Sequence, residues 1–123
     1  MKTTFDTVIF YVHNVELLTD FYVDNFGFSV QEQADGWALL NSGSVRLGLH
    51  RMGAGYTSET PGTGSNVKLV FETEESIETA RSLFCSRNIP MREIKTFPGY
   101  TYWLCDGTDP EGNVFQLKST TRE

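Results

Sequence analysis

The sequence has little cysteine, no long apolar run and few basic residues, and each shortage excludes a class of protein. Cys85 and Cys105 are the only cysteines among 123 residues, too few for a disulfide framework or a cysteine-based zinc site. The longest purely apolar run, residues 8–12, is far shorter than the roughly 18 residues that suggest a membrane span. Ten Lys and Arg against sixteen Asp and Glu give a net charge of −6, which argues against nucleic-acid and anionic-membrane partners. Because the N-terminus also lacks the apolar segment of a signal peptide, we expect a cytoplasmic protein with reduced thiols.

The first half of the chain predicts a strand, a helix and three further strands. Residues 8–12 are β-branched and aromatic, as is typical of a strand. Asn14 is a good helix N-cap, and apolar residues recur at helical spacing until Gly27, which suits the left-handed position after a helix. Further strands are expected at residues 28–32, 37–41 and 44–50. Ser42 and Gly43 then form a two-residue turn between the last two strands.

The second half repeats this order after a stretch rich in Gly, Ser, Thr and Pro. A strand is expected at residues 67–71, and Thr73 is the expected N-cap of a helix whose apolar stripe is Ile77, Ala80 and Phe84. Three strands follow, at residues 91–97, 100–106 and 113–118. The sequence therefore predicts an α+β chain of two βαβββ modules. Module one covers residues 1–52, a linker covers 53–65 and module two covers 66–123.

Several motifs in these modules resemble a known superfamily. The Phe-Tyr pair at 21–22, the Asn-Phe-Gly-Phe run at 25–28 and the Asp-Pro-Glu-Gly-Asn turn at 109–113 are similar to the vicinal oxygen chelate superfamily. This superfamily includes glyoxalase I, extradiol dioxygenases, fosfomycin-resistance enzymes and bleomycin-resistance proteins. The Gly-Trp strand and tight turn at 36–43 resemble the bleomycin-resistance branch most. The resemblance covers nearly the whole chain and implies a cup of curved mixed sheets with the helices outside, and a homodimer.

The resemblance also implies where a divalent metal would be held in the enzymes of this superfamily, by His and Glu side chains from four strands. Carried onto this sequence, the four positions are Thr7, Gly48, Val67 and Gln116. Gly and Val have no side-chain donor, and Thr and Gln are weak neutral donors. We therefore expect no metal and no other cofactor.

The predicted hairpin supplies a physical reason why the second of these positions, Gly48, lacks a metal-binding side chain. With Ser42 and Gly43 as the turn, Trp37 lies opposite Gly48, so the indole covers the position where the glycine has no side chain. Strand alternation places Leu39, Arg46 and His50 on the face that carries Trp37. The alternative is that Trp37 faces the helix as an ordinary core residue.

The candidate ligand-binding residues combine apolar walls with a few orienting polar groups. They are Thr7, Trp37, Leu39, Arg46, Gly48, His50, Val67, Tyr100, Tyr102 and Gln116. Tyr100 and Tyr102 share one strand face and suit stacking on aromatic or cationic ligands, although core or dimer-interface roles are alternatives. His50 is the candidate general base, and the alternative is a histidine that is only exposed or hydrogen-bonded.

These observations favour a metal-independent small-molecule-binding protein that encloses an aromatic or cationic ligand in a cup between the modules. The alternative is a glyoxalase-fold isomerase, lyase or dioxygenase-like enzyme with a non-standard or metal-free site. A further alternative is a cup filled by its own side chains. The expected partners are a small-molecule ligand and a second copy of the chain, with no nucleic acid and no membrane.

Overall fold

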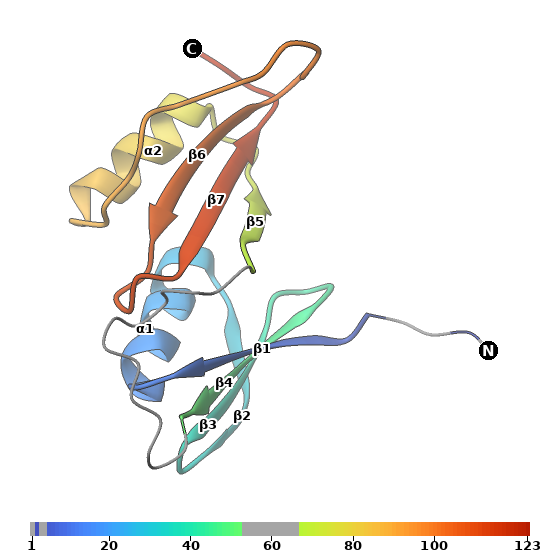
Figure 1. Cartoon of the computed structure of the whole chain (residues 1–123), viewed down its shortest axis with the longest axis vertical. Helices are drawn as coiled ribbons and strands as arrows, with labels where there is room; N and C mark the ends of the chain where they lie inside the picture. Colours follow the sequence, from blue (N-terminus) through green and yellow to red (C-terminus); the bar gives the residue numbers. More distant parts are fainter. Residues whose placement is uncertain (1, 3–4, 53–66) are drawn as a thin grey trace. The chain divides into compact units, whose positions relative to one another are not determined.

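The computed structural model describes residue 2, residues 5–52 and residues 67–123. The chain divides into two compact units, Met1–Pro61 and Gly62–Glu123. In each unit, the described residues form one helix and one mixed sheet (Figure 1). The chain is thus an α+β protein, as predicted, whereas the expected linker at 53–65 lies outside the described residues. Among the described helices, none has the length and apolar character needed to cross a membrane.

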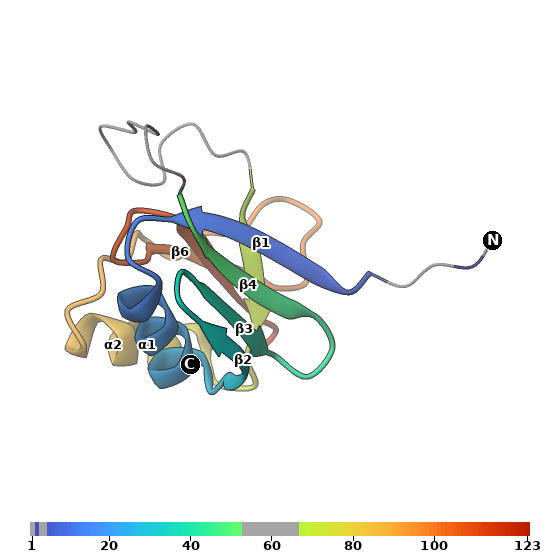
Figure 2. The ribbon, with the colours of Figure 1, turned by 90° about the horizontal axis from the view of Figure 1, so that it is seen from below.

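The first unit contains a four-stranded sheet in the order β1-β4-β3-β2, seen side by side in Figure 2. Its elements are β1 (Thr7–Val12), α1 (Val15–Phe26), β2 (Ser29–Ala34), β3 (Trp37–Asn41) and β4 (Arg46–Arg51). β1 pairs with β4 in parallel, and the other two pairings are antiparallel. The βαβββ order of the first module is therefore confirmed.

The second unit contains a three-stranded sheet in the order β5-β7-β6. Its elements are β5 (Leu69–Glu72), α2 (Ile77–Ser86), β6 (Trp103–Thr108) and β7 (Val114–Ser119). β5 pairs with β7 in parallel, and β6 pairs with β7 antiparallel. In both units, therefore, the first strand of the module pairs in parallel with its last strand.

Helix α1 begins and ends where local chemistry predicts. The Asn14 side chain accepts a hydrogen bond from the backbone N–H of Leu17, which satisfies one of the donors exposed at a helix start. At the other end, Gly27 has φ of 71°, a left-handed conformation, and its N–H donates to the carbonyl of Val23. Leu18 and Tyr22 are almost fully buried against the sheet.

Helix α2 begins three residues later than the sequence predicts. Ser76, not Thr73, is the N-cap, because its hydroxyl accepts from the N–H of Thr79 at 3.1 Å. The Thr73 hydroxyl instead accepts from the N–H of Glu75, which closes a short turn before the helix. The predicted stripe of Ile77, Ala80 and Phe84 is buried.

The predicted strand at 91–97 is reduced to two isolated bridges. Met91 pairs with Gly107 and Lys95 pairs with Leu104, so the register slips by one residue between the bridges and the ladder is interrupted. The next strand, expected at 100–106, begins only at Trp103, after a turn in which the N–H of Tyr100 donates to the carbonyl of Phe97.

The hairpin between β3 and β4 differs from its prediction by two residues. Trp37 lies opposite His50 rather than Gly48. The predicted two-residue turn is wrong because four residues, Ser42 to Val45, connect the strands and the Ser42 N–H donates to the Val45 carbonyl. Since side chains alternate with a period of two, a two-residue shift leaves every side chain on its predicted face.

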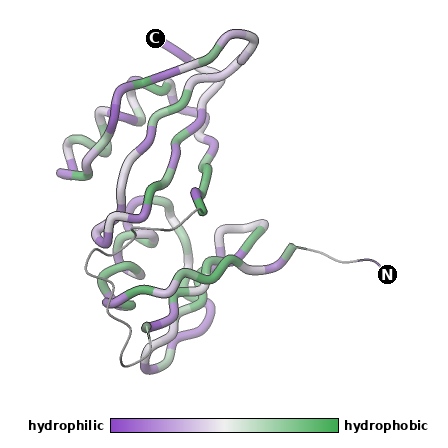
Figure 3. The backbone as a smooth tube through the Cα atoms, viewed as in Figure 1, coloured by the Kyte–Doolittle hydropathy of each residue, from purple (hydrophilic) through white to green (hydrophobic). Residues whose placement is uncertain are grey.

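Alternation along the strands gives each sheet one buried face. In the first unit the residues that face α1 are almost completely buried, and β1 is hydrophobic along most of its length in Figure 3. These residues are Phe10, Val12, Ala38, Leu40, Leu47 and Leu49. In the second unit, Phe84 of α2 packs edge-to-face on Phe115 of β7, with ring centroids 5.7 Å apart. The opposite face of the first sheet carries Thr7, Trp37, Leu39, Arg46, Gly48 and His50, and that of the second carries Gln116, whereas Val67, Tyr100 and Tyr102 lie outside the strands.

Candidate functional site

The face of the first sheet that points away from α1 carries an exposed aromatic cluster, which we call the aromatic face. It consists of Ile9, Tyr11, Trp37, Gly48 and His50. The His50 ring lies between two aromatic rings, with centroid separations of 5.3 Å to Tyr11 and 6.0 Å to Trp37. Tyr11 is 62% exposed and Ile9 is 45% exposed, so the face offers apolar area to solvent.

Trp37 covers Gly48, as the sequence predicts, although the two residues are diagonal neighbours instead of partners. A Cβ atom added to Gly48 would lie 2.7 Å from Trp37 Cη2 and 3.1 Å from Ile9 Cγ1. The direct partner of Gly48 is Leu39, which is buried. Trp37 is half-buried and lies on the face opposite Ala38, so the alternative of a helix-facing core tryptophan is wrong.

His50 is positioned by its own backbone. Its Nδ1 lies 2.7 Å from the carbonyl oxygen of Arg51, so in the neutral ring Nδ1 carries the proton and donates it there. The other ring nitrogen, Nε2, is then a hydrogen-bond acceptor on an exposed side chain. This tautomer is the form that a general base or a ligand acceptor requires.

Charged groups at the border of the aromatic face are paired with one another. Arg46 Nη1 donates to Asp6 Oδ1 at 2.6 Å, and the Thr7 hydroxyl donates to the second oxygen of Asp6. Trp37 Nε1 donates to Glu32 Oε1 at 3.1 Å, which fixes the orientation of the indole. Arg46 and Thr7 therefore hold Asp6 at this border.

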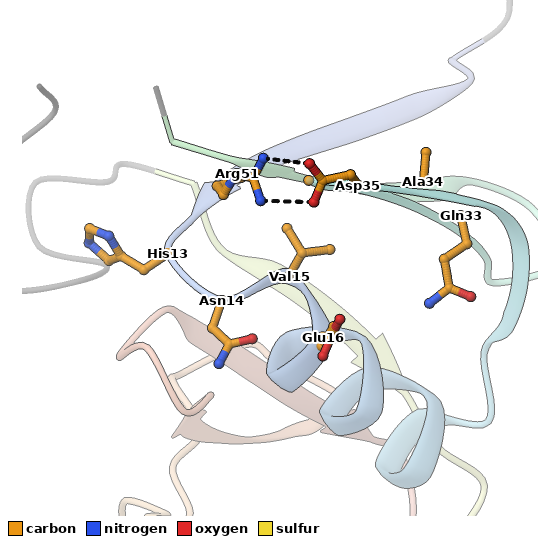
Figure 4. Close-up of a pocket in the computed structure, with 9 residues that line it drawn as sticks. His13, Asn14, Val15, Glu16, Gln33, Ala34, Asp35 and Arg51 are labelled. Carbon is orange, nitrogen blue, oxygen red and sulfur yellow. Dashed lines mark hydrogen bonds and ion pairs between the residues drawn. The ribbon is translucent and has the colours of Figure 1, made fainter. Parts of the chain in front are cut away.

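A separate polar pocket of about 490 Å³ lies at the start of α1 in the first unit. In Figure 4, Arg51 from the end of β4 faces Asp35 from the β2–β3 turn, joined by two hydrogen bonds of 3.1 Å. Hydrogen bonding to Arg51 and its positive charge lower the pKa of the Asp35 carboxyl. None of the predicted site residues lines this pocket, which sequence reasoning missed because its walls come from turns and helix ends.

The second unit presents a buried acid on the sheet face opposite α2. Asp106 of β6 is 2% exposed; its Oδ1 accepts from Gln116 Nε2 at 2.8 Å. Its Oδ2 accepts from Lys68 Nζ at 3.1 Å and from Lys95 Nζ at 3.3 Å. Burial raises the pKa of Asp106, but the hydrogen bonds from Gln116 and the two lysines outweigh this effect and hold the pKa below its ordinary value.

Sequence reasoning placed Gln116 on this face and missed the other three members of the cluster. An aspartate directly after the apolar run of residues 103–105, within a predicted strand, was the available signal. Val67, the predicted third metal position, precedes β5 and is 46% exposed, while its neighbour Lys68 is the residue that reaches the cluster.

Tyr100 and Tyr102 form a tilted ring pair before β6. Their ring centroids are 4.8 Å apart, and Lys118 Nζ lies 4.4 Å from the centroid of Tyr102. Trp103 has a different contact, with Arg122 over its ring at 4.4 Å. The two tyrosines lie together, although they precede β6 and so do not share a strand face as predicted from the sequence.

The residues at the four positions where the resemblance implies metal ligands are not suited to bind a metal ion. At Gly48, Trp37 occupies the space of a side chain, and Gln116 uses its amide to donate to Asp106. Thr7 donates its hydroxyl to Asp6, and Val67 has no donor. Among the described residues, no three His, Cys, Asp or Glu side chains converge as a metal site requires.

Comparisons with known proteins show what fold these units make. Neither a family model nor a curated protein matches the chain. Among solved structures, a glyoxalase/bleomycin resistance protein/dioxygenase family enzyme from Burkholderia phytofirmans PsJN matches with a TM-score of 0.80 and 17% identity, over 97% of this chain and 100% of that one. Lactoylglutathione lyase from Agrobacterium tumefaciens matches with a TM-score of 0.74 and 17% identity, over 96% of this chain and 94% of that one.

A third match is the fosfomycin resistance protein FosX from Mesorhizobium loti, with a TM-score of 0.67 and 13% identity, over 98% of this chain and 92% of that one. At these identities the likeness shows the fold. The chain therefore has the fold that these glyoxalase and resistance proteins share, and the resemblance predicted from its sequence motifs is confirmed as a likeness of fold.

Proposed function

We propose that this chain is a metal-independent small-molecule-binding protein whose ligand lies on the aromatic face. The observation that carries the proposal is the contact between the indole of Trp37 and Gly48, with His50 and Tyr11 continuing the ring surface. Aromatic rings held on a rigid sheet offer a large apolar area together with polar ring edges, which suits stacking on a planar ligand.

The charges near the aromatic face favour a neutral or cationic planar compound. Arg46 is neutralised by Asp6, whereas Glu32 lies beside Trp37 with the indole N–H as its partner. Ring faces attract cations through their quadrupole. The net charge of −6 supports the same preference at long range.

The proposal is tested by titrating the protein with two planar aromatic probes of opposite charge, proflavine and naphthalene-2-sulfonate. Binding is followed through the amide NMR shifts of Tyr11, Gly48 and His50. We expect saturable shifts with proflavine, and a loss of affinity of about tenfold in Trp37→Ala because stacking is worth roughly 1 kcal/mol or more.

The matched control is Trp103→Ala, which removes the other tryptophan and its contact with Arg122 in the second unit. We expect this variant to bind proflavine as the parent protein does. An equal loss in both tryptophan variants, or no loss in Trp37→Ala, would contradict the proposal.

The second candidate function is a metal-free isomerase or lyase with His50 as general base. It is favoured by the hydrogen bond from Nδ1 to the Arg51 carbonyl, which leaves Nε2 as the basic atom on an exposed ring. A glyoxalase-type turnover that His50→Gln abolishes, with a loss far larger than the loss of proflavine affinity in the same variant, would support it over a binding protein.

A homodimer is also part of the proposal. Exposed apolar side chains outside the aromatic face, Val30 on β2 and Val70 on β5, provide area that a second copy would cover. Light scattering is expected to give about twice the 13.9 kDa of one chain. A mass near that of one chain at micromolar concentration would argue against the dimer.

A further inference from the structure

Two lysines of the second unit share one oxygen of a single buried carboxylate. Lys68 Nζ and Lys95 Nζ lie 3.1 Å and 3.3 Å from Asp106 Oδ2. Each lysine side chain is 41% exposed, whereas Asp106 is 2% exposed. The carboxylate therefore lies beneath the two ammonium groups, which stand between it and solvent.

We propose that Lys68 and Lys95 form a binding site for a small oxyanion, namely the phosphate or carboxylate group of a ligand. Two positive charges against one negative charge leave this cluster with a net charge of +1. Each ammonium group has three N–H donors, and one of them is directed to Asp106. The remaining donors of both lysines are available to an anion in contact with solvent.

The geometry of the cluster holds the two ammonium groups at a spacing that one oxyanion can bridge. Both nitrogen atoms contact the same oxygen, so they are close neighbours. Lys68 comes from the segment before β5 and Lys95 from the bridge beside β6, and both side chains reach Asp106 on β6. Like charges at this distance repel, and an anion seated between them relieves that repulsion.

Gln116 prevents the carboxylate from reorienting. Its Nε2 donates a hydrogen bond to Asp106 Oδ1 at 2.8 Å, so the other oxygen, Oδ2, remains directed at the lysines. The cluster is therefore preorganised, and an incoming anion does not have to order it.

The nearby charges on the same sheet face do not cancel the site. Glu72 lies 3.8 Å from Lys118, so this acid has a cation of its own. Although the whole chain carries a net charge of −6, exposed charges farther than about 8–10 Å away are screened at physiological salt. The local sign is thus set by the two lysines and Asp106.

The test is a titration of isotopically labelled protein with inorganic phosphate, and separately with acetate, at constant ionic strength maintained with chloride. Amide shifts of Asp106 and Gln116 and the side-chain NH₂ of Gln116 report binding. We expect saturable phosphate binding that weakens about tenfold in Lys68→Gln and in Lys95→Gln, because each loses a charge-assisted hydrogen bond. Lys118→Gln is the matched control and is expected to change the affinity less than about twofold.

Unlike the two lysine variants, Asp106→Asn is expected not to weaken phosphate binding. It removes the internal counter-charge, so phosphate should bind at least as tightly as to the parent protein. Saturable binding of either anion that requires both lysines supports the proposal, and the tighter anion identifies the ligand class. Shifts that do not saturate, an equal loss in Lys118→Gln, or abolished binding in a folded Asp106→Asn protein would overturn it.

Discussion

Because Gly48 has no side chain, the indole of Trp37 can lie over it on the aromatic face. Trp37 and Ile9 approach this glycine closely enough that even a methyl group has no space without movement. Strand parity in the sequence places Trp37 on the face of Gly48, whereas the approach of Ile9 from β1 was not predicted. The sequence does not reveal the exact pairing, because the length of the β3–β4 connection depends on how Ser42 and Val45 close it.

The variant Gly48→Ala tests this contact. The new Cβ would lie 2.7 Å from Trp37 Cη2, so the indole has to move, and overpacking of this kind costs about 1–2 kcal/mol of unfolding free energy. Urea unfolding measures the cost, and tryptophan fluorescence in a Trp103→Phe background reports the displaced ring. In the double variant with Trp37→Ala the cost should largely vanish. If Gly48→Ala costs the same in both backgrounds, the indole is not the cause.

Asp106 makes stability depend on pH in a defined direction. Its pKa is lower in the folded chain than the unfolded value of about 3.9, so its contribution to stability is present above that value and is lost as the pH falls through the folded pKa. We expect urea unfolding to show that the parent protein loses its advantage over Asp106→Asn as the pH falls below about 4.

The comparison variant for this experiment is Asp35→Asn. Asp35 also has a lowered pKa, through Arg51, but both side chains are exposed, so removing this ion pair should alter the pH profile little. A profile for Asp106→Asn that runs parallel to that of the parent down to pH 2.5 would contradict the assigned role of Asp106.

At the scale of elements, the sequence predicted those features of the helices that depend on residues close together in the chain. The Asn14 cap, the left-handed Gly27 and the stripe on α2 follow from residues within one or two helical turns. The interrupted strand at 91–97 was not predictable in this way, because its two bridges depend on partners at Leu104 and Gly107, far along the chain. The cluster around Asp106 was missed for the same reason, since Lys68 reaches it from the segment before β5.

The start of α2 gives a prediction about a single element. Ser76→Ala removes the acceptor of the Thr79 N–H and should cost about 1 kcal/mol of unfolding free energy. Thr73→Ala removes only a contact within the preceding turn and should cost less. Thermal or urea unfolding of the two variants decides between the caps. A larger cost for Thr73→Ala would restore the N-cap expected from the sequence alone.

At the scale of the whole molecule, the repeated order of elements and three short motifs were enough to predict the fold. The likeness to solved structures at 13–17% identity extends over nearly the whole chain, although no family model matches it. A fold of this kind hosts lyases and resistance proteins alike, so the function must be argued from the side chains that the sheets present.

Metal analysis and metal removal test, on the whole molecule, the expectation that the protein binds no metal. Thr7, Gly48, Val67 and Gln116 offer no thiolate, imidazole or carboxylate, and divalent metals in proteins of this size are held by such groups. We expect elemental analysis of the purified protein to find no stoichiometric zinc, nickel, iron or manganese. We also expect EDTA to leave both the unfolding temperature and proflavine binding unchanged, because protein side chains hold one another in the aromatic face and in the cluster around Asp106. One metal ion per chain, with a lower unfolding temperature after its removal, would show that other residues form a metal centre.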